Sequence, residues 1–490
     1  MALVGLLLTW GTCATVTSGE DPPAAVCAPV TPTYASAPAE DLDWDQFLGP
    51  NRNGVSDGPP LLSEWPAGGP RVVWKLPCKT GDASPIVKDG ILVLMERQAK
   101  KKTSAIARAA TNAMASAVAN AVGQAEPLPD EVILALDAGT GRELWRRNFA
   151  SDWIGNQYTW GPEATPAAAK DKVVALFVNG RLRCLDIKSG NLVWEKDLIE
   201  EYQLTRRGGH PEYQSCTSPL IVGDLAIVEL CSGQTGLAAF DLSDGHEVWR
   251  TPDFGNYGSS PGFMTITGTP VVVAMGLGGN RKAFAGGDVM GFNALSGDLV
   301  WYAKAGKTYF NTPPPIAAEG MVFVEGGGGD GPTYAFVPPE SGQGKARTAW
   351  KDPSHQVRFS NYLCYRGLLF GLGWPAHGGR KMQWCSDPHT GKLCWDREVK
   401  DKFEYQWMIG SDGKVIQFFD RGELVLFDAD AREGYRELAR AKVTDFTWSQ
   451  PSLCRGMLFI RTRTQVVCLD LATSPATPET IAETGKAEKK

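Results

Sequence analysis

Short apolar runs recur along most of the chain, separated by polar turns that usually contain glycine. In "ALDAGTGRELW" (135–145) an apolar run ends, Asp137 to Gly141 form a turn, and a second strand closes on Trp145. Asp bonds the backbone two residues on and Gly accepts positive φ, so the pattern predicts a β-hairpin. The copies are "CLDIKSGNLVW" (184–194), "AFDLSDGHEVW" (239–249), "GFNALSGDLVW" (291–301), a stretched one from Ala335 to Trp350, and the weaker "WCSDPHTGKLCW" (384–395) and "LFDADAREGYREL" (426–438).

A second element alternates with these hairpins. It reads Ser/Thr-Pro, a short apolar strand, a turn and another strand, as in "SPIVKDGILVL" (84–94) and "SPLIVGDLAIV" (218–228), and it occurs eight times with its degenerate copies. One element of each kind gives four short strands, and the closing Trp residues from Trp145 to Trp395 are spaced by 45–55 residues. A repeat of this length and composition predicts an all-β fold, an eight-bladed β-propeller of four-stranded antiparallel blades.

The two ends of the repeat array complete each other. The last hairpin stops at "CLDL" (468–471), without a turn or a closing strand, whereas "RVVWK" (71–75) is a strand without a blade. Pairing of these two segments would close the ring and remove its open edge. The closing aromatic residues are then expected to pack between blades: Trp74, Trp145, Trp194, Trp249, Trp301, Trp350 and Trp395.

One segment interrupts the first blade. Residues 100–127 are rich in Ala, and apolar side chains recur there every four residues, at Ile106, Ala110, Met114, Val118 and Val122. This period predicts one inserted amphipathic helix, which either packs on the ring, the favoured alternative, or contacts a partner.

The turn motif also supports a family. Ala135, Asp137, Thr140, Gly141 and Trp145, at their spacing, resemble the docking motif of quinoprotein-like (PQQ-like repeat) β-propellers, and the match recurs over roughly 71–471. "DWDQFLGPNRNGVS" (43–56) resembles the segment before the repeats in many secreted bacterial members. That family includes PQQ dehydrogenases, the BamB lipoprotein of outer-membrane barrel assembly and many members of unknown activity. The resemblance therefore implies the fold and leaves the function open.

Composition and the segments at the two chain ends predict the cellular location. The net charge of −6 gives no global nucleic-acid footprint. The apolar start is too short to span a bilayer comfortably and reads as a signal peptide, although it has no Lys or Arg before its apolar core. We expect a periplasmic or secreted monomer without a transmembrane span, divided into a signal peptide (1–19), a Pro/Ala-rich leader (20–42), the propeller (43–471) and a disordered tail (472–490).

The 11 Cys residues form neither a disulfide scaffold nor a zinc array. Cys216 and Cys231 lie symmetrically about one predicted turn, and Cys385 and Cys394 about another. In an exported protein either pair can oxidise, or all four are small buried hydrophobes.

The loops that enter the first strands and those that join the second and third strands share one face of a propeller. Here they carry the aromatic residues Trp160, Tyr213, Tyr257, Phe310, Phe359, Tyr405 and Trp448, and the basic residues Arg181, Arg281, Arg380, Arg421, Arg461 and Arg463. We expect Trp160, Tyr213, Tyr257, Phe310, Tyr405 and Trp448, with Arg281, Arg380 and Arg421, to line one channel mouth. Rings and guanidinium groups suit a flat or anionic ligand. The alternative is that the rings pack between blades and the arginines are solvated.

Two function classes follow. The first, favoured, is a non-catalytic envelope propeller that binds a protein, a glycan or a small ligand. The second, implied by the resemblance, is a quinoprotein-type oxidoreductase with PQQ and calcium. Such dehydrogenases use Ca²⁺, an Asp base and often a disulfide between adjacent cysteines, whereas this chain has no Cys-Cys dipeptide and offers Glu163 and Asn361 as oxygen donors, with only Asp330 as a base. Its five His residues have no metal-site spacing.

Overall fold

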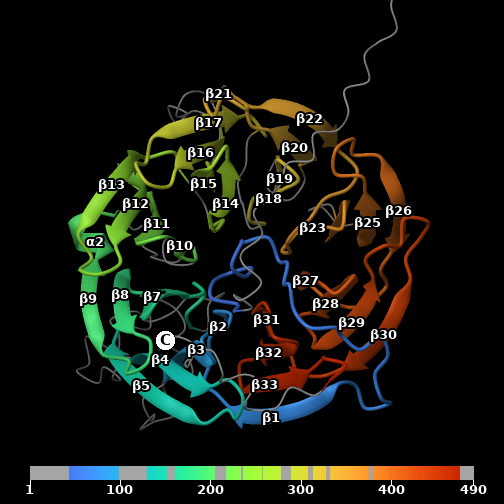
Figure 1. The fold of residues 1–490 in the computed structure, drawn as a ribbon, viewed down its shortest axis with the longest axis horizontal. Coiled ribbons are helices and arrows are strands. Elements are labelled where there is room, and N and C mark those ends of the chain that lie inside the picture. Colours follow the sequence, from blue (N-terminus) through green and yellow to red (C-terminus); the bar gives the residue numbers. More distant parts are fainter. Residues whose placement is uncertain are drawn as a thin grey trace, which may run out of the picture. The chain divides into compact units, whose positions relative to one another are not determined.

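The computed structural model describes residues 43–98, 130–151, 161–204, 217–232, 235–255, 258–276, 288–306, 313–326, 331–374 and 379–474. The chain divides into two units, residues 1–34 and 35–490, and all described residues belong to the second. In this second unit, eight sheets follow one another around a central axis (Figure 1). The predicted eight-bladed propeller is therefore confirmed. No helix in the part of the chain covered by these ranges is long and apolar enough to cross a membrane.

Each blade runs outward from a short inner strand, and neighbouring strands within its four-stranded meander are antiparallel (Figure 1). Blades 1 to 4 are β2 (Ile86–Lys88), β3 (Ile91–Gln98), β4 (Asp130–Asp137), β5 (Glu143–Ala150); β6 (Ala167–Ala169), β7 (Lys172–Leu176), β8 (Arg181–Asp186), β9 (Leu192–Asp197); β10 (Leu220–Val222), β11 (Leu225–Ser232), β12 (Thr235–Asp241), β13 (Glu247–Pro252); and β14 (Gly262–Ile266), β15 (Thr269–Met275), β16 (Val289–Asn293), β17 (Leu299–Ala303). Blades 5 to 8 are β18 (Ile316–Ala318), β19 (Met321–Glu325), β20 (Thr333–Val337), β22 (Arg347–Asp352); β23 (Leu363–Tyr365), β24 (Leu368–Gly373), β25 (Met382–Ser386), β26 (Leu393–Glu398); β27 (Gln406–Ser411), β28 (Lys414–Phe419), β29 (Glu423–Asp428), β30 (Glu437–Lys442); and β31 (Ser452–Cys454), β32 (Met457–Arg461), β33 (Gln465–Asp470), β1 (Arg71–Pro77).

Two small elements lie outside this scheme. The short strand β21 (Gly344–Lys345) adds to the outer edge of blade 4, parallel to β17. The one-turn helix α2 (Leu198–Glu201) follows β9. The predicted helix at 100–127 lies outside the described residues.

Blade 8 is built from both ends of the repeat array, as predicted. β1 pairs with β33 over a register that runs from Arg71 opposite Asp470 to Pro77 opposite Gln465. The Arg71 guanidinium lies 2.5 Å from the Asp470 carboxylate at the start of this pairing. The ring is thus closed by hydrogen bonds between segments almost 400 residues apart.

Six of the seven closing Trp residues dock their blade on the next one, which confirms the packing role predicted for them. Each donates an indole N–H to a backbone carbonyl of the next blade's turn: Trp74 to Ala138, Trp145 to Ile187, Trp194 to Leu242, Trp249 to Ala294, Trp350 to Pro388 and Trp395 to Ala431, at 2.7–3.1 Å. The turn glycine receives the ring. Gly190, for example, has φ +69°, and a Cβ on it would lie 2.5 Å from the Trp145 ring. Trp301 differs, because its indole covers Gly291 of its own blade.

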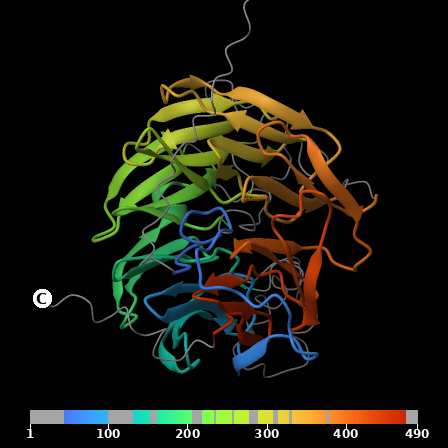
Figure 2. The ribbon, with the colours of Figure 1, turned by 45° about the vertical axis from the view of Figure 1, so that its right-hand side comes forward.

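The segment before the repeats runs into the middle of the ring, where it forms hydrogen bonds with the blades (Figures 1 and 2). Its hydrogen bonds reach five blades: Trp44 pairs with Val87 of blade 1, Ala168 of blade 2 donates to Asp45, Arg52 donates to Ser218 and Pro219 of blade 3, Gly410 of blade 7 donates to Gly54, and Leu48 donates to Gln450 of blade 8. Trp44, Leu48 and Arg52 are each 1% exposed. We call residues 43–56 the plug.

After the plug, the chain contacts blades 7 and 8. The Leu61 amide donates to Asp412 at 2.8 Å, and Leu61 bridges to Ala472. The Thr473 amide donates to the Pro60 carbonyl at 2.9 Å.

Candidate functional site

The channel mouth is the face at which the inner strands begin, and its described side chains come mainly from blades 6, 7, 8, 1 and 2. Phe359, Tyr405 and Trp448 enter blades 6, 7 and 8. The ring centroids of Phe359 and Tyr405 are 5.0 Å apart with planes at 27°, and those of Tyr405 and Trp448 are 5.0 Å apart at 38°. All three residues are partly exposed. They form one continuous array, which we call the aromatic stack.

Phe359 is held in an unusual backbone conformation. Its φ is +50°, in the left-handed region that bulky residues rarely adopt. Such conformations cost about 1–3 kcal/mol and persist only where the surroundings impose them. The surrounding structure therefore holds Phe359 in the stack although its backbone disfavours this conformation.

Cationic side chains cover the flanks of the stack. The Arg358 guanidinium lies 5.0 Å from the Phe359 ring centroid, and that of Arg463 lies 4.8 Å from the Trp448 ring. Lys381 lies 4.0 Å from the Phe403 ring. These distances are within the range of cation–π attraction.

Two carboxylates occupy equivalent places in blades 1 and 2. Asp82 stands two residues before Ser84 in "KTGDASP", and Glu163 two before Thr165 in "GPEATP". Burial raises the pKa of Asp82, against the opposing charges of Arg463 and Arg461, and the Arg463 Nε lies 3.5 Å from Asp82 Oδ1. Burial, followed by the neighbouring Asp82 carboxylate, raises the pKa of Glu163 to about 8. Glu163 is therefore protonated in a large share of molecules at neutral pH.

The Tyr405 phenol belongs to the same electrostatic group. Burial raises its pKa, and the nearby charge of Glu163 adds to the effect. The phenol therefore remains a neutral hydrogen-bonding group at physiological pH.

Several buried donors at the mouth have no partner among the described residues. They are the indole Nε1 of Trp448, the amide Nε2 of Gln450 and the guanidinium Nε of Arg358. A buried donor without an acceptor costs about 1–3 kcal/mol. Asp82 Oδ2 is a buried acceptor in the same condition. A ligand with hydrogen-bond acceptors can relieve the cost of the unpartnered donors.

The plug forms the floor of this site. The Leu48 amide donates to Gln450 Oε1 at 3.2 Å, which fixes the Gln450 side chain and leaves its Nε2 as the free donor. Arg52 donates to the Pro219 carbonyl at 2.7 Å, just before β10 begins. Burial lowers the pKa of Arg52 to about 9, although the charge of Glu229 opposes this.

The structure describes only some of the predicted site residues. Tyr405 and Trp448 lie in the aromatic stack. Arg380 points to solvent with 78% of its side chain exposed and pairs with Glu398 at 3.8 Å, and Arg421 is exposed. Asn361, expected as an oxygen donor, is 0% exposed and bonds the Met408 backbone through both amide atoms. Trp160, Tyr213, Tyr257, Phe310 and Arg281 lie outside the described residues.

Of the two predicted cysteine pairs, the structure describes both side chains of only one. Cys216 and the side chain of Cys231 lie outside what the structure describes. Cys385 and Cys394 are both free thiols. Burial, with contributions from the adjacent Cys394, raises the pKa of Cys385, so the two sulfur atoms are neighbours in blade 6.

The sequence analysis missed Arg358, Asp82 and the plug as parts of this site. For Asp82 a signal was present, because the carboxylate two residues before Ser/Thr recurs in consecutive blades. The plug has no repeat period that would have placed it in the middle of the ring.

Comparison with known proteins supports the architecture. The family model described as outer membrane protein assembly factor BamB matches residues 52–262 and 129–358, which together cover more than half of the chain. The chain belongs to this family of PQQ-like repeat β-propellers.

Individual relatives are distant. The quinohemoprotein alcohol dehydrogenase ADH-IIG of Pseudomonas putida is 27% identical over 156 residues, 31% of this chain and 19% of that protein. The lanthanide-dependent methanol dehydrogenase of Methylacidiphilum fumariolicum (strain SolV) is 39% identical over 71 residues, 13% of this chain and 11% of that protein. The solved structure of ADHIIG from Pseudomonas putida HK5 has a TM-score of 0.58 at 13% identity and covers 89% of this chain and 81% of its own. This structural similarity shows the fold alone.

Proposed function

We propose that this protein is a non-catalytic binding propeller of the cell envelope, and that its channel mouth binds a ligand with a flat face and hydrogen-bond acceptors. The observation that carries the proposal is the aromatic stack with its unpartnered donors. Aromatic rings, guanidinium groups and a few convergent polar atoms are the usual lining of a ligand site. The plug supports the proposal, because it gives the mouth a floor.

The envelope location rests on the apolar N-terminal segment and on the description of the matching family model. Within this proposal, the ligand is a small molecule, a glycan or a side chain of an envelope protein. Fractionation of native cells tests the location. Recovery of the chain with Met1 intact in the cytosolic fraction would refute it.

Binding is tested with a panel of cell-wall saccharide fragments, planar aromatic carboxylates and envelope extract. We expect Trp448→Ala to weaken binding of the active compound by about 5- to 150-fold, equivalent to about 1–3 kcal/mol. The matched control is Trp395→Ala, which removes a docking ring 8% exposed and remote from the mouth. It should lower the melting temperature and leave the dissociation constant unchanged. A Trp448→Ala variant that binds as the wild type does would contradict the proposal.

The second candidate function is a quinoprotein-type oxidoreductase. In its favour are the local similarity to a quinohemoprotein alcohol dehydrogenase and the ring and guanidinium groups of the mouth, which fit a planar polycarboxylate such as PQQ. The fit to calcium is poorer. Among the described residues, the carboxylates near the stack are those of Asp82, Glu163, Glu404 and Asp420. Burial raises the pKa of Asp82, Glu163 and Asp420, which disfavours the charged form that binds a cation, and Asn361 is bonded to backbone. The one described group of three candidate metal ligands, Asp241, Asp244 and His246, lies in a turn of blade 3.

Incubation with PQQ and Ca²⁺, followed by gel filtration and measurement of quinone absorbance in the protein peak, separates the two functions. Bound quinone that is reduced by added alcohol would favour the oxidoreductase. Absence of stoichiometric quinone, together with binding of another compound that depends on Trp448, would favour the binding propeller.

A further inference from the structure

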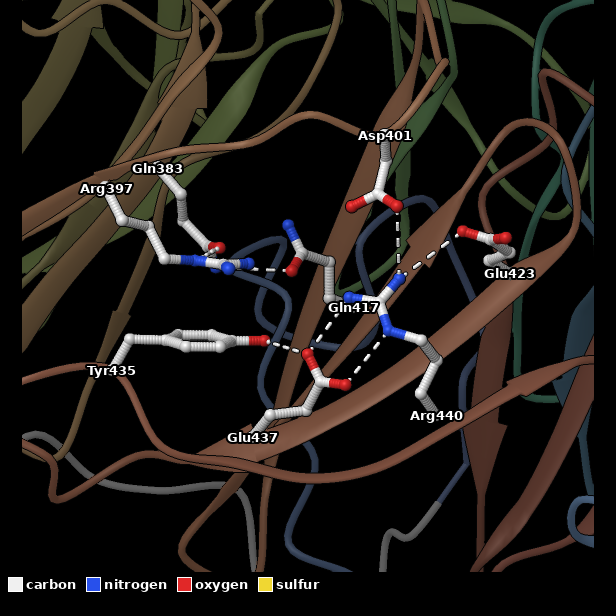
Figure 3. Close-up of polar contacts among 8 residues, drawn as sticks. All are labelled: Gln383, Arg397, Asp401, Gln417, Glu423, Tyr435, Glu437 and Arg440. Carbon is white, nitrogen blue, oxygen red and sulfur yellow. Dashed lines mark hydrogen bonds and ion pairs between the residues drawn. The ribbon is translucent and has the colours of Figure 1, made fainter. Parts of the chain in front are cut away.

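A chain of buried side chains crosses the interface between blades 6 and 7. Arg397 donates to Gln383 at 2.9 Å, Gln383 to Gln417 at 3.2 Å, and Gln417 to Gln406 at 3.0 Å. Gln406 then donates to the hydroxyl of Ser360. The three glutamines are 0–1% exposed. We call Gln383, Gln417 and Gln406 the glutamine chain; Figure 3 shows its outer part.

Two of these glutamines stand at positions that are apolar in blades 1 to 4. Gln383 lies two residues before the partner of the closing Trp in its blade, where blades 1 to 4 have Ile133, Leu182, Leu237 and Val289. Gln417 occupies the second-strand position at which the same blades have Leu94, Ala175, Val228 and Ala274. The two glutamines face each other across one interface, so they form a matched polar pair.

Such a pair has a cost that apolar residues would avoid. A buried amide loses its hydration and needs partners for its polar atoms, and replacement of both partners by apolar groups is often neutral or stabilising. When its hydrogen bonds are all formed, a chain of buried polar side chains fixes each side chain in a single orientation.

The inner end of the chain lies at the aromatic stack. Gln406 directly follows Tyr405, and Ser360 directly follows Phe359. The hydrogen bond from the Gln406 side chain to the Ser360 hydroxyl therefore links the two residues that directly follow the stacked rings. It also restrains the segment in which Phe359 adopts φ +50°.

The outer end is anchored at the blade rim. The Arg397 guanidinium lies 3.6 Å from the ring centroid of Tyr435, whose hydroxyl donates to Glu437 at 2.9 Å (Figure 3). Glu437 in turn accepts two bonds from Arg440 at 2.9 Å. Because Arg397 only donates, every amide in the glutamine chain must accept from the outer side and donate toward the channel.

We propose that Gln383, Gln417 and Gln406 are positioning residues, which hold Phe359 against Tyr405 and so set the shape of the channel mouth. This inference rests on the proposed function only in that the shape of the mouth is assumed to matter for ligand binding. The coupling between the glutamine chain and the contact of Phe359 with Tyr405 is a property of the unliganded protein. The glutamine chain transmits the position of the blade 6 and blade 7 strands to the two rings.

The test uses the full chain labelled with 3-fluorotyrosine and observed by ¹⁹F NMR without ligand. The protein has 12 Tyr residues, and loss of one resonance in Tyr405→Phe assigns the signal of interest. In the double variant Gln383→Leu/Gln417→Leu, which places apolar residues at both repeat positions, we expect the Tyr405 resonance to move toward the frequency of free fluorotyrosine. Ser360→Ala, which removes the acceptor at the mouth, should move it in the same direction.

The matched control is Leu424→Ala, which creates a cavity at a buried position of β29 in blade 7 without touching the polar chain. It should lower the melting temperature and leave the Tyr405 resonance in place. An unchanged resonance in both folded test variants, or an equal displacement in Leu424→Ala, overturns the inference. Failure of the Trp448-dependent binding experiment would refute the proposed function and leave this coupling untouched, because no ligand is present here.

Discussion

At the scale of single residues, the mouth keeps two carboxylates in a setting that disfavours their charge. Glu163 is partly exposed, yet burial and Asp82 raise its pKa to about 8. Its proton is therefore held more tightly in the folded than in the unfolded chain. Stability supplied by this group is fully present below the unfolded pKa of about 4.5 and is lost as pH rises through the folded pKa.

This predicts a pH-dependent difference between the wild type and Glu163→Gln. Between pH 5 and pH 9, we expect the unfolding free energy of the wild type to fall by about 2 kcal/mol relative to the variant, after allowance for solvent screening. Denaturant titrations at both pH values measure it. Parallel curves for wild type and Glu163→Gln would contradict the prediction.

The repeat turn offers a second test at residue scale. A Cβ at Gly190 would lie 2.5 Å from the Trp145 ring, whereas Gly268, also at positive φ, has nothing within 4 Å. Gly190→Ala should therefore lose about 1–3 kcal/mol beyond the backbone strain that both variants share. Thermal unfolding of the two variants side by side measures the excess. Equal losses would show that the docked Trp tolerates the added methyl group.

At the scale of elements, the blades were predictable because each is a copy of a motif whose chemistry is local. Asp, Gly and Trp at fixed spacing specify the turn and the docking ring, and the incomplete final hairpin identified β1 as its missing strand. The side chains that lie at the mouth were less predictable, because the loops that carry them do not share a repeated sequence motif. Arg380 and Arg421 occupy the expected loops but extend to solvent, whereas Arg358 lies over Phe359. Side-chain direction at a loop depends on neighbours from other blades.

At the scale of elements, the role of β1 in closing the ring can be tested. Trp74 packs against Phe459 of its own blade and donates to Ala138 of blade 1, so it links the closure to the next interface. Trp74→Ala should cost about 3–5 kcal/mol, as for a buried aromatic side chain. Val72→Ala, on the same strand but 54% exposed, should cost less than about 0.5 kcal/mol. Urea unfolding of both variants distinguishes a structural β1 from a strand that is loosely attached.

At the scale of the whole molecule, two segments stabilise the ring, and they differ in how many blades they contact. β1 closes the last blade, and the plug ties five blades to one segment. The plug was recognised in the sequence only as a segment that precedes the repeats. Its position could not be predicted, because each of its contacts is made with a different blade and none follows a period.

A truncation series separates the two segments. Relative to a chain that begins at Asp43, a chain that begins at Arg71 loses the plug but keeps β1, whereas one that begins at Gly81 loses both. Loss of the plug removes the buried side chains of Trp44 and Leu48, each contributing about 1.5–3 kcal/mol, so the melting temperature should fall while the protein stays monomeric. Loss of β1 as well exposes the edge of β33, which can pair with another molecule, so this chain should aggregate. Light scattering and thermal unfolding of the three chains measure both effects. Aggregation of the chain that begins at Arg71 would show that the plug, rather than β1, keeps the ring closed.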